Sequence, residues 1–195
     1  MEQAFQSLLH NRKNMTQDLQ IEIISTDKIS PELDKQIDQL DHLAFADEKH
    51  DDPEFNSIDW SSHIEYMALG RVDNELVTLL GLLKREILVG EKPVWVAGVG
   101  GVATHPNWQK RGFSSTLLNA SEKFMREEMK VPFGLLVCAD ERRSFYGRAG
   151  WKLIADKLFF IQNGERRSLK TSVMILPLST EVWPSGEIDL RGLPW

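Results

Sequence analysis

Cysteine is almost absent from this chain: Cys138 is its single cysteine in 195 residues. One cysteine cannot form an internal disulfide, and chains without disulfides are typical of reducing compartments, so we predict a cytoplasmic location. The sequence also lacks a cluster of cysteine and histidine residues with the spacing of a metal site, and we therefore expect no metal cofactor.

Two further absences exclude broad classes of partner. No apolar run is long enough to span a bilayer, and residues 1–20 lack the apolar core of a signal peptide, so we expect no membrane partner. Lysine and arginine together number 23, against 29 aspartate and glutamate residues, which leaves a net charge of −6. This acidic balance provides no broad basic surface, so we expect no nucleic-acid partner.

What is present is the composition of an ordinary globular protein, with 42% hydrophobic and 27% charged residues. The length suits one domain with a short extension. We predict an N-terminal extension over residues 1–18 and a single domain over residues 19–195.

Apolar periodicity and turn signals predict an α+β fold, a mixed and mostly antiparallel central sheet flanked by helices. A surface loop is expected over residues 47–58, followed by a short helix that Asp59 would cap. Strands are expected at 19–25, 64–71, 75–88, 93–104, 132–138, 151–161 and 171–176. Helices are expected at 30–45, with Ser30 as N-cap, at 112–130, and at 140–149, with Gly150 at the C-terminal cap.

The strand over 93–104 contains three glycines, Gly98, Gly100 and Gly101. Glycine inside a strand marks a bulge or a place where another part of the chain approaches closely. We therefore predict one of these two features in the second half of this strand.

The segment from Val102 to Ser115 reads as the end of a strand, a short loop and the start of a helix. The first turn of a helix has free N–H groups and a positive dipole end, which together favour a phosphate group. Gly112 would let the backbone approach such a ligand, and Ser114 and Ser115 would add hydroxyl groups. The alternative is that Gly112 only ends a loop before an ordinary helix, because short glycine patterns are weakly specific.

Two motifs together resemble the Gcn5-related N-acetyltransferase superfamily over about residues 20–177. The first is Gln109-Lys110-Arg111-Gly112-Phe113-Ser114, in which serine replaces the glycine or alanine that usually ends the motif. The second is the segment from Ser144 to Trp151, which contains Phe145-Tyr146. The resemblance implies acetyl-CoA as the acyl donor, held by Val102, Ala103, Thr104, Gln109, Lys110, Arg111, Gly112, Phe113, Ser114 and Ser115.

Acetyl transfer from a thioester requires a neutral amine, a polarised carbonyl and a proton for the departing thiolate. The resemblance assigns carbonyl polarisation to a backbone N–H near Val102 and the proton to Tyr146. A phenol with a pKa of about 10 is protonated at pH 7 and can donate to a thiolate. The alternative for Tyr146 is a core aromatic residue whose hydroxyl is hydrogen-bonded.

The general base is left open between Asp47, Glu48 and His105. A nucleophilic Cys138 would need an activating base, and none is evident, so the alternative is a small buried residue.

The ends of the chain add a closer likeness, to aminoglycoside 2′-N-acetyltransferases. It rests on Ala44-Phe45-Ala46-Asp47, on Asp59-Trp60, on Trp108 and on a final Trp195. In that family the carboxylate of the last tryptophan helps to hold the cationic sugar. The likeness implies acceptor-side positions at Glu48, Gly100, Gly101 and Trp195.

The chain also departs from that family. A glutamate stands there at the position of Gly100, and an acidic stretch there corresponds to Arg166, Arg167 and Lys170 here. We expect an amine of a small molecule as acceptor, for example an aminoglycoside or another amino sugar. A polyamine or peptide amine, a non-catalytic acyl-CoA-binding or sensing domain, and an interaction module are the alternatives. The apolar strands and the C-terminal tail, the residues that follow the strand expected at 171–176, are also compatible with a homodimer.

Overall fold

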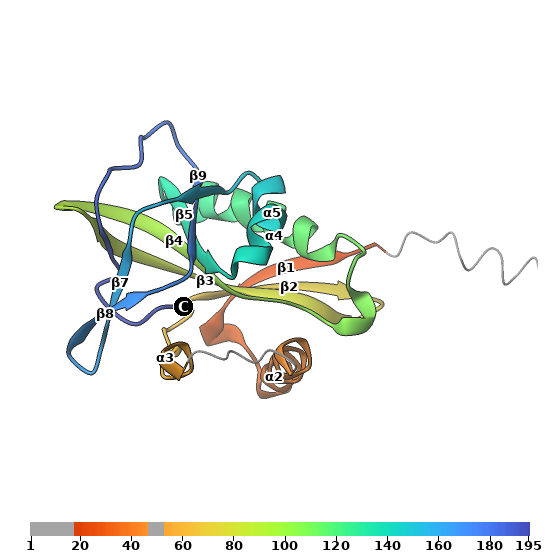
Figure 1. Cartoon of the computed structure of the whole chain (residues 1–195). Helices are drawn as coiled ribbons and strands as arrows, with labels where there is room; N and C mark the ends of the chain where they lie inside the picture. The colour runs from red at the N-terminus through yellow and green to blue at the C-terminus, as the bar shows by residue number, and fades with distance from the viewer. Residues whose placement is uncertain (1–17, 47–52) are drawn as a thin grey trace, which may run out of the picture.

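The computed structural model describes residues 18–46 and 53–195, and its strands form one curled sheet with helices on both faces (Figure 1). The strands are β1 (Gln20–Ser25), β2 (Tyr66–Val72), β3 (Glu75–Val89), β4 (Lys92–Thr104), β5 (Phe133–Cys138), β6 (Lys152–Ile154), β7 (Leu158–Gln162), β8 (Glu165–Leu169), β9 (Ser172–Pro177) and β10 (Ile188–Asp189). The α-helices are α2 (Pro31–Phe45), α3 (Pro53–Asn56), α4 (Phe113–Phe124) and α5 (Arg143–Arg148). The 3₁₀ turns are η1 (Thr26–Lys28), η2 (Pro106–Trp108) and η4 (Asp140–Arg142), and η3 (Met125–Met129) is a π-helical turn.

The sheet is mixed and mostly antiparallel, as predicted. Its strand order is β6-β9-β5-β4-β3-β10-β7-β8, and β2 pairs with β3 and carries β1 on its other side. Within residues 18–46 and 53–195, only β4 with β5 and β10 with β7 run parallel. The long strand β3 pairs with β2 over its first half and with β10 over its last two residues. It therefore connects the β1–β2 pair to the part of the sheet formed by β10, β7 and β8.

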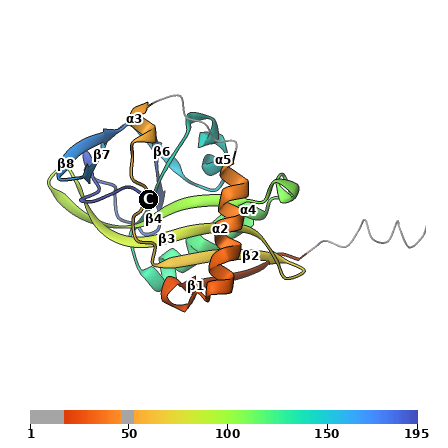
Figure 2. The same cartoon turned by 90° about the horizontal axis from the view of Figure 1, so that it is seen from below.

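Alternating side chains of β3 and β4 supply the cores on the two faces of the sheet. On one face Leu80, Leu82, Ala97 and Val99 pack against α4 and α5. The other face packs against α2, where Leu40 is buried. Figures 1 and 2 show α2 and α3 on the face opposite α4 and α5, with the C-terminus on the side of α2 and α3.

Local capping signals predicted the start of α2 and the glycine that follows α5. Ser30 caps α2, with its hydroxyl accepting from the N–H of Leu33 at 3.2 Å, and Pro31 is the first helical residue. Gly150 follows α5 with φ of +86°, the left-handed conformation that ends many helices.

Several predicted boundaries were wrong. The expected strand over 151–161 is two strands, β6 and β7, which pair with different neighbours. No helix follows Asp59, whose carboxylate instead accepts from the N–H of Ser61 at 2.9 Å in a turn, while the unpredicted α3 precedes it. The helix expected to reach residue 130 leaves α-geometry at Met125 and ends in the π-helical turn η3.

Strand β8 was not predicted because its residues are mostly charged, with the sequence ERRSL. Charged side chains are typical of a strand at the edge of a sheet, and β8 is such an edge. Residues 1–17 of the predicted extension lie outside the described residues. Among the residues that the structure describes, no helix combines the length and apolar character needed to cross a membrane.

Candidate functional site

Strands β4 and β5 separate from each other half-way along their length. Their parallel pairing runs only from Val96–Phe133 to Gly98–Leu135, although β4 continues to Thr104 and β5 continues to Cys138. The second half of β4 therefore has backbone groups that face β5 without pairing to it. The predicted residues Val102, Ala103 and Thr104 all lie on this half.

A β-bulge at Gly101 interrupts β4 at the same place. Leu79 pairs with Ala103 and Gly81 pairs with Gly100, so two residues of β4 face one residue of β3. Gly101 has φ of +57°, a conformation that glycine adopts easily and other residues adopt rarely. The bulge confirms one of the two features predicted from the glycines, and it turns the backbone near Val102 away from the regular ladder.

The predicted phosphate-binding segment forms a sharp turn into α4. Gly112 is the N-cap of α4, with φ of +83°, and a Cβ built on it would meet no atom within 4 Å. Glycine is therefore required here by backbone conformation rather than by space. Phe113, Ser114 and Ser115 form the first turn of the helix, where N–H groups lack helical partners.

The loop before this turn is tied to the end of β4. The side-chain amide of Gln109 donates to the carbonyl oxygen of Thr104 at 3.3 Å, and the Arg111 guanidinium lies over the Trp108 ring at 4.6 Å. The indole N–H of Trp108 donates to Glu75 at 3.2 Å. The structure thus brings Thr104, Gln109, Arg111 and Gly112 together, with Lys110 exposed beside them.

Tyr146 lies on α5, directly beyond the end of β5. Its side chain is 9% exposed, and its ring stands edge-on to Phe145 and Trp151 at centroid distances of 5.0 and 6.3 Å. A core packing role is thus present, as the alternative reading expected, and it fixes the ring on the α4 side of the sheet.

Asp140 ties the start of this helical segment to β9. Its carboxylate accepts from the Ser172 hydroxyl at 2.6 Å, and the Arg143 guanidinium donates to both residues. The hydrogen bond from Ser172, and then the charge of Arg143, lower the pKa of Asp140 below its ordinary value. The result is an ionised anchor that holds α5 against the sheet.

The other candidate residues are placed differently. Burial raises the pKa of the Cys138 thiol, and its sulfur lies 3.8 Å from the Met174 sulfur, which favours a packed thiol over a nucleophile. The Nδ1 atom of His105 accepts from the N–H of Asn107 at 3.2 Å, so one of its nitrogens is occupied in capping the turn η2. Asp47 and Glu48 lie outside the described residues.

Trp195 covers the remaining two glycines of β4. A Cβ on Gly98 would lie 2.3 Å from the Trp195 ring atom Cε2, and a Cβ on Gly100 would lie 2.8 Å from the Trp195 backbone carbonyl carbon. Both distances are shorter than real contacts, so neither position can carry a side chain while Trp195 stays in place. Trp195 thus leaves no room at residue 100 for the glutamate that the aminoglycoside 2′-N-acetyltransferases have at this position.

Arg85 and Ser62 hold the tail in this position, and the sequence analysis missed both. Arg85 donates to the Leu193 carbonyl at 2.7 Å and to the Ser62 hydroxyl at 3.1 Å, and its guanidinium lies over the Trp195 ring at 5.1 Å. The Ser62 hydroxyl itself donates to the Leu193 carbonyl at 2.7 Å. Burial lowers the pKa of Arg85, although a guanidinium stays charged at neutral pH.

Structural partners hold the basic residues Arg166, Arg167 and Lys170. Arg166 pairs with Glu187 at 3.0 Å, Lys170 pairs with Glu54 at 2.7 Å, and Arg167 donates to the Ser57 hydroxyl at 2.7 Å. These contacts link β8 and the residue after it to α3 and to the tail. They account for this basic stretch without an acceptor.

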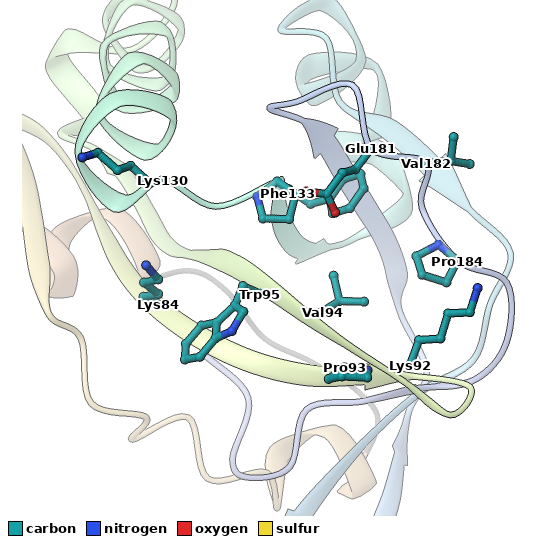
Figure 3. Close-up of a pocket in the computed structure, with 11 residues that line it drawn as sticks. Lys84, Lys92, Pro93, Val94, Trp95, Lys130, Phe133, Glu181, Val182 and Pro184 are labelled. Atoms are coloured by element: carbon teal, nitrogen blue, oxygen red, sulfur yellow. The ribbon is translucent and has the colours of Figure 1, made fainter.

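A surface groove of about 500 Å³ lies at the other end of β4, away from the Gly112 turn, and Lys130 at the end of η3 borders it (Figure 3). It is lined by Trp95, Lys84 and Lys130 together with residues of the tail. The Lys84 ammonium group donates a hydrogen bond to the Met129 carbonyl at 2.7 Å. None of the predicted site residues that the structure describes lines this groove. In the described parts of the chain, no group of three or more His, Cys, Asp or Glu side chains is placed to hold a metal ion.

Comparison with known proteins agrees with this geometry. The family model described as an acetyltransferase (GNAT) domain matches residues 27–154. A comparison of the sequence with curated proteins finds no match.

Solved structures share the fold. A GNAT family acetyltransferase from Brucella melitensis, in complex with acetyl-CoA, has 14% identity and a TM-score of 0.57 over 87% of this chain and 94% of its own. The catalytic domain of the Tetrahymena GCN5 histone acetyltransferase, in complex with coenzyme A, has 13% identity and a TM-score of 0.58 over 86% and 98%. A protein from Enterococcus faecalis V583 has 18% identity and a TM-score of 0.52 over 69% of this chain, which spans 32% of that protein.

Proposed function

The chain belongs to the GNAT family of acetyltransferases, and we propose that it moves an acetyl group from acetyl-CoA directly to a primary amine of a small molecule. The observation that carries this proposal is the separation of β4 from β5 beyond Gly98, with the bulge at Gly101 and the Gly112 turn at its far end. This arrangement supplies a row of backbone groups for an extended ligand and a helix start for its phosphates.

We assign acetyl-CoA, the acetyl donor, to this row of backbone groups on β4 and to the start of α4. The assignment rests on the resemblance and on where the structure places these residues. The backbone of Val102, Ala103 and Thr104 would pair with the pantetheine arm as an added strand does. The pyrophosphate would lie over residues 109–115, near the free N–H groups of the first turn of α4. A backbone N–H near Val102, turned outward by the bulge, would polarise the thioester carbonyl.

Tyr146 is the proposed general acid. In the transfer, the neutral amine nitrogen bonds to the thioester carbon and the carbon–sulfur bond breaks. The departing thiolate takes a proton, the nitrogen loses one to water, and the donor of the first proton regains it from solvent. A phenol is protonated at pH 7 and can supply this proton. The packing of Tyr146 against Phe145 and Trp151 limits the positions of its hydroxyl, which favours a single direction of proton donation.

The acceptor belongs on the opposite face of the sheet in this proposal, near Gly100, Gly101 and Trp195, with Glu48 as a further candidate. The amine must lose a proton before attack, and for an alkylammonium at pH 7 this costs about 4 kcal/mol, at about 1.36 kcal/mol per pKa unit. Trp195, which lies against Gly98 and Gly100, would line this acceptor side, as the likeness to aminoglycoside 2′-N-acetyltransferases implies. An amino sugar, such as an aminoglycoside, is the acceptor class that the likeness supports.

One observation favours a second candidate, a non-catalytic acyl-CoA-binding or sensing domain. Trp195 occupies the space of a side chain at residue 100, so β4 presents no carboxylate there to act as a base. The homodimer and the cytoplasmic location remain predictions from the sequence.

Thiol release from acetyl-CoA, measured with aminoglycosides, polyamines, amino acids and peptides, tests the proposal. Amine-dependent release supports the transferase, and the preferred acceptor identifies its class. Binding of acetyl-CoA, seen as a raised melting temperature, without release for any amine favours the sensing domain. Neither binding nor release would contradict both functions.

A further inference from the structure

We propose that Thr78 on β3 is a positioning residue for the coenzyme A site, acting through a relay of hydroxyl groups to the first turn of α4. The relay consists of Thr78, Thr104 and Ser114. The Thr78 and Thr104 oxygens are 2.8 Å apart, and the Thr104 and Ser114 oxygens are 2.5 Å apart. This inference rests on the proposed function, because it concerns the same donor site.

The direction of each hydrogen bond in the relay follows from counting protons. A hydroxyl has one proton to donate, and Thr78 donates it to the Ala103 carbonyl at 2.8 Å. Thr78 must therefore accept from Thr104, and Thr104 must in turn accept from Ser114. The proton of Ser114 is thus directed inward, toward the sheet.

Burial makes this relay costly to break. Thr78 is 0% exposed, so a hydroxyl left without a partner there could not turn to water. The relay connects three elements: Thr78 lies on β3, Thr104 ends β4, and Ser114 is the second residue of α4. It therefore fixes the distance between the end of β4 and the helix start, the two places assigned to the pantetheine arm and the pyrophosphate.

The relay also separates the roles of the neighbouring hydroxyl groups. Ser114 has given its proton to Thr104 and cannot donate to a phosphate oxygen. The Thr116 hydroxyl donates to the Gly112 carbonyl at 3.1 Å. Ser115, which is exposed, is the hydroxyl of this turn left to donate to a phosphate. Ser114, which ends the motif in this chain, thus anchors the helix, and Ser115 is the serine that binds the ligand.

The test compares Thr78→Val and Ser115→Ala with the control Ser121→Ala. Ser121 is equally buried and lies on the same helix, but its hydroxyl donates within the helix, to the Leu117 carbonyl at 2.9 Å. Dissociation constants for coenzyme A and for pantetheine, which lacks the pyrophosphate, are measured by calorimetry on folded protein. Circular dichroism confirms that each variant is folded.

Thr78→Val and Ser115→Ala are each expected to weaken coenzyme A binding about 3- to 10-fold, the effect of one hydrogen bond. Pantetheine binding should change less than about 2-fold in both variants, and Ser121→Ala should match the wild type with both ligands. Ser114→Ala combined with Thr78→Val should be no weaker than either change alone, because both break one relay.

Unchanged coenzyme A binding in a folded Thr78→Val protein would overturn the inference and leave the proposed function intact. Equal weakening by Ser121→Ala would also overturn it, since any buried hydroxyl of the helix would then have the same effect. Failure of the wild-type protein to bind coenzyme A would contradict the proposed function itself. These results are distinct, so each points to the statement that is wrong.

Discussion

The indole of Trp195 occupies the space that a side chain on Gly98 would fill, at a distance of 2.3 Å from the position of a Cβ there. One residue ends the chain described here and the other lies in the middle of β4, on the half that pairs with β5. The contact joins the tail to the strand just where β4 and β5 begin to separate. The shape of the proposed acceptor side therefore depends on a glycine.

Gly98→Ala tests this contact. The new methyl group would overlap the ring of Trp195, which must move, and we expect a loss of about 1–3 kcal/mol in the free energy of unfolding. Urea unfolding followed by tryptophan fluorescence measures it. Gly147→Ala in α5 is the control, because a Cβ there meets nothing within 4 Å. This variant should raise the free energy of unfolding by about 0.5–1 kcal/mol. A wild-type unfolding midpoint for Gly98→Ala would show that the contact is not formed.

Arg85→Met tests the anchor of the tail. It removes the bonds from Arg85 to Leu193 and Ser62 and should destabilise the protein by about 2 kcal/mol, as expected for hydrogen bonds from a charged group. The control Arg191→Met breaks an exposed pair with Glu86 and should cost less than about 1 kcal/mol. Hydrogen exchange of residues 188–195, followed by mass spectrometry, should become faster in Arg85→Met only. Equal rates in both variants would contradict the anchor.

Tyr146→Phe tests the general acid. The change keeps the ring and its packing, and it removes only the hydroxyl, so kcat should fall about 10²- to 10⁴-fold. The dissociation constant for acetyl-CoA and the melting temperature should stay close to those of the wild type. Steady-state kinetics with the best acceptor from the amine panel provide the measurement. Wild-type turnover in this variant would show that another group, or water, supplies the proton.

Asp140→Asn tests the anchor of α5 by its pH dependence. Since the folded-state pKa of Asp140 is lowered, its ionised form stabilises the protein above the unfolded pKa of about 3.9, and this contribution is lost as the pH falls through the lower folded value. The difference in unfolding free energy between wild type and Asp140→Asn should therefore shrink between about pH 4 and pH 2.

Asp41→Asn supplies a comparison of opposite sign. Partial desolvation and the neighbouring charge of Asp38 raise the pKa of Asp41, although its side chain is exposed, so its ionised form is slightly destabilising and the variant should be slightly more stable than the wild type at pH 7. That advantage should disappear as acid protonates Asp41.

A pH-independent difference in unfolding free energy between wild type and Asp140→Asn would contradict the assigned ion pair and hydrogen bond of Asp140.

Local signals and long-range contacts differed in how well the sequence predicted them. The turn at Gly112 and the cap at Ser30 were predictable because backbone conformation and capping depend on residues next to each other. The short charged strand β8 was not, because its stability comes from pairing with β7 rather than from its own apolar pattern.

The acceptor side shows the same limit more clearly. The glycines of β4 indicated a bulge or a close approach, and both are present, yet nothing local identified Trp195 as the group that approaches Gly98. Arg85 also gave no motif, since its partners Ser62 and Leu193 lie far from it in sequence. Three charged residues, Lys84, Arg85 and Glu86, interrupt the apolar run of β3, and they were the available sign of a buried polar contact.

The central claim is direct transfer of the acetyl group from acetyl-CoA to an amine. Mass spectrometry of a reaction with isotopically labelled acetyl-CoA, quenched during turnover, tests it most directly. We expect one labelled acetyl group on the amine for each thiol released, and no label on the protein. Labelled protein, with the acetyl group on Cys138, or thiol release without acetylated amine, would contradict the account.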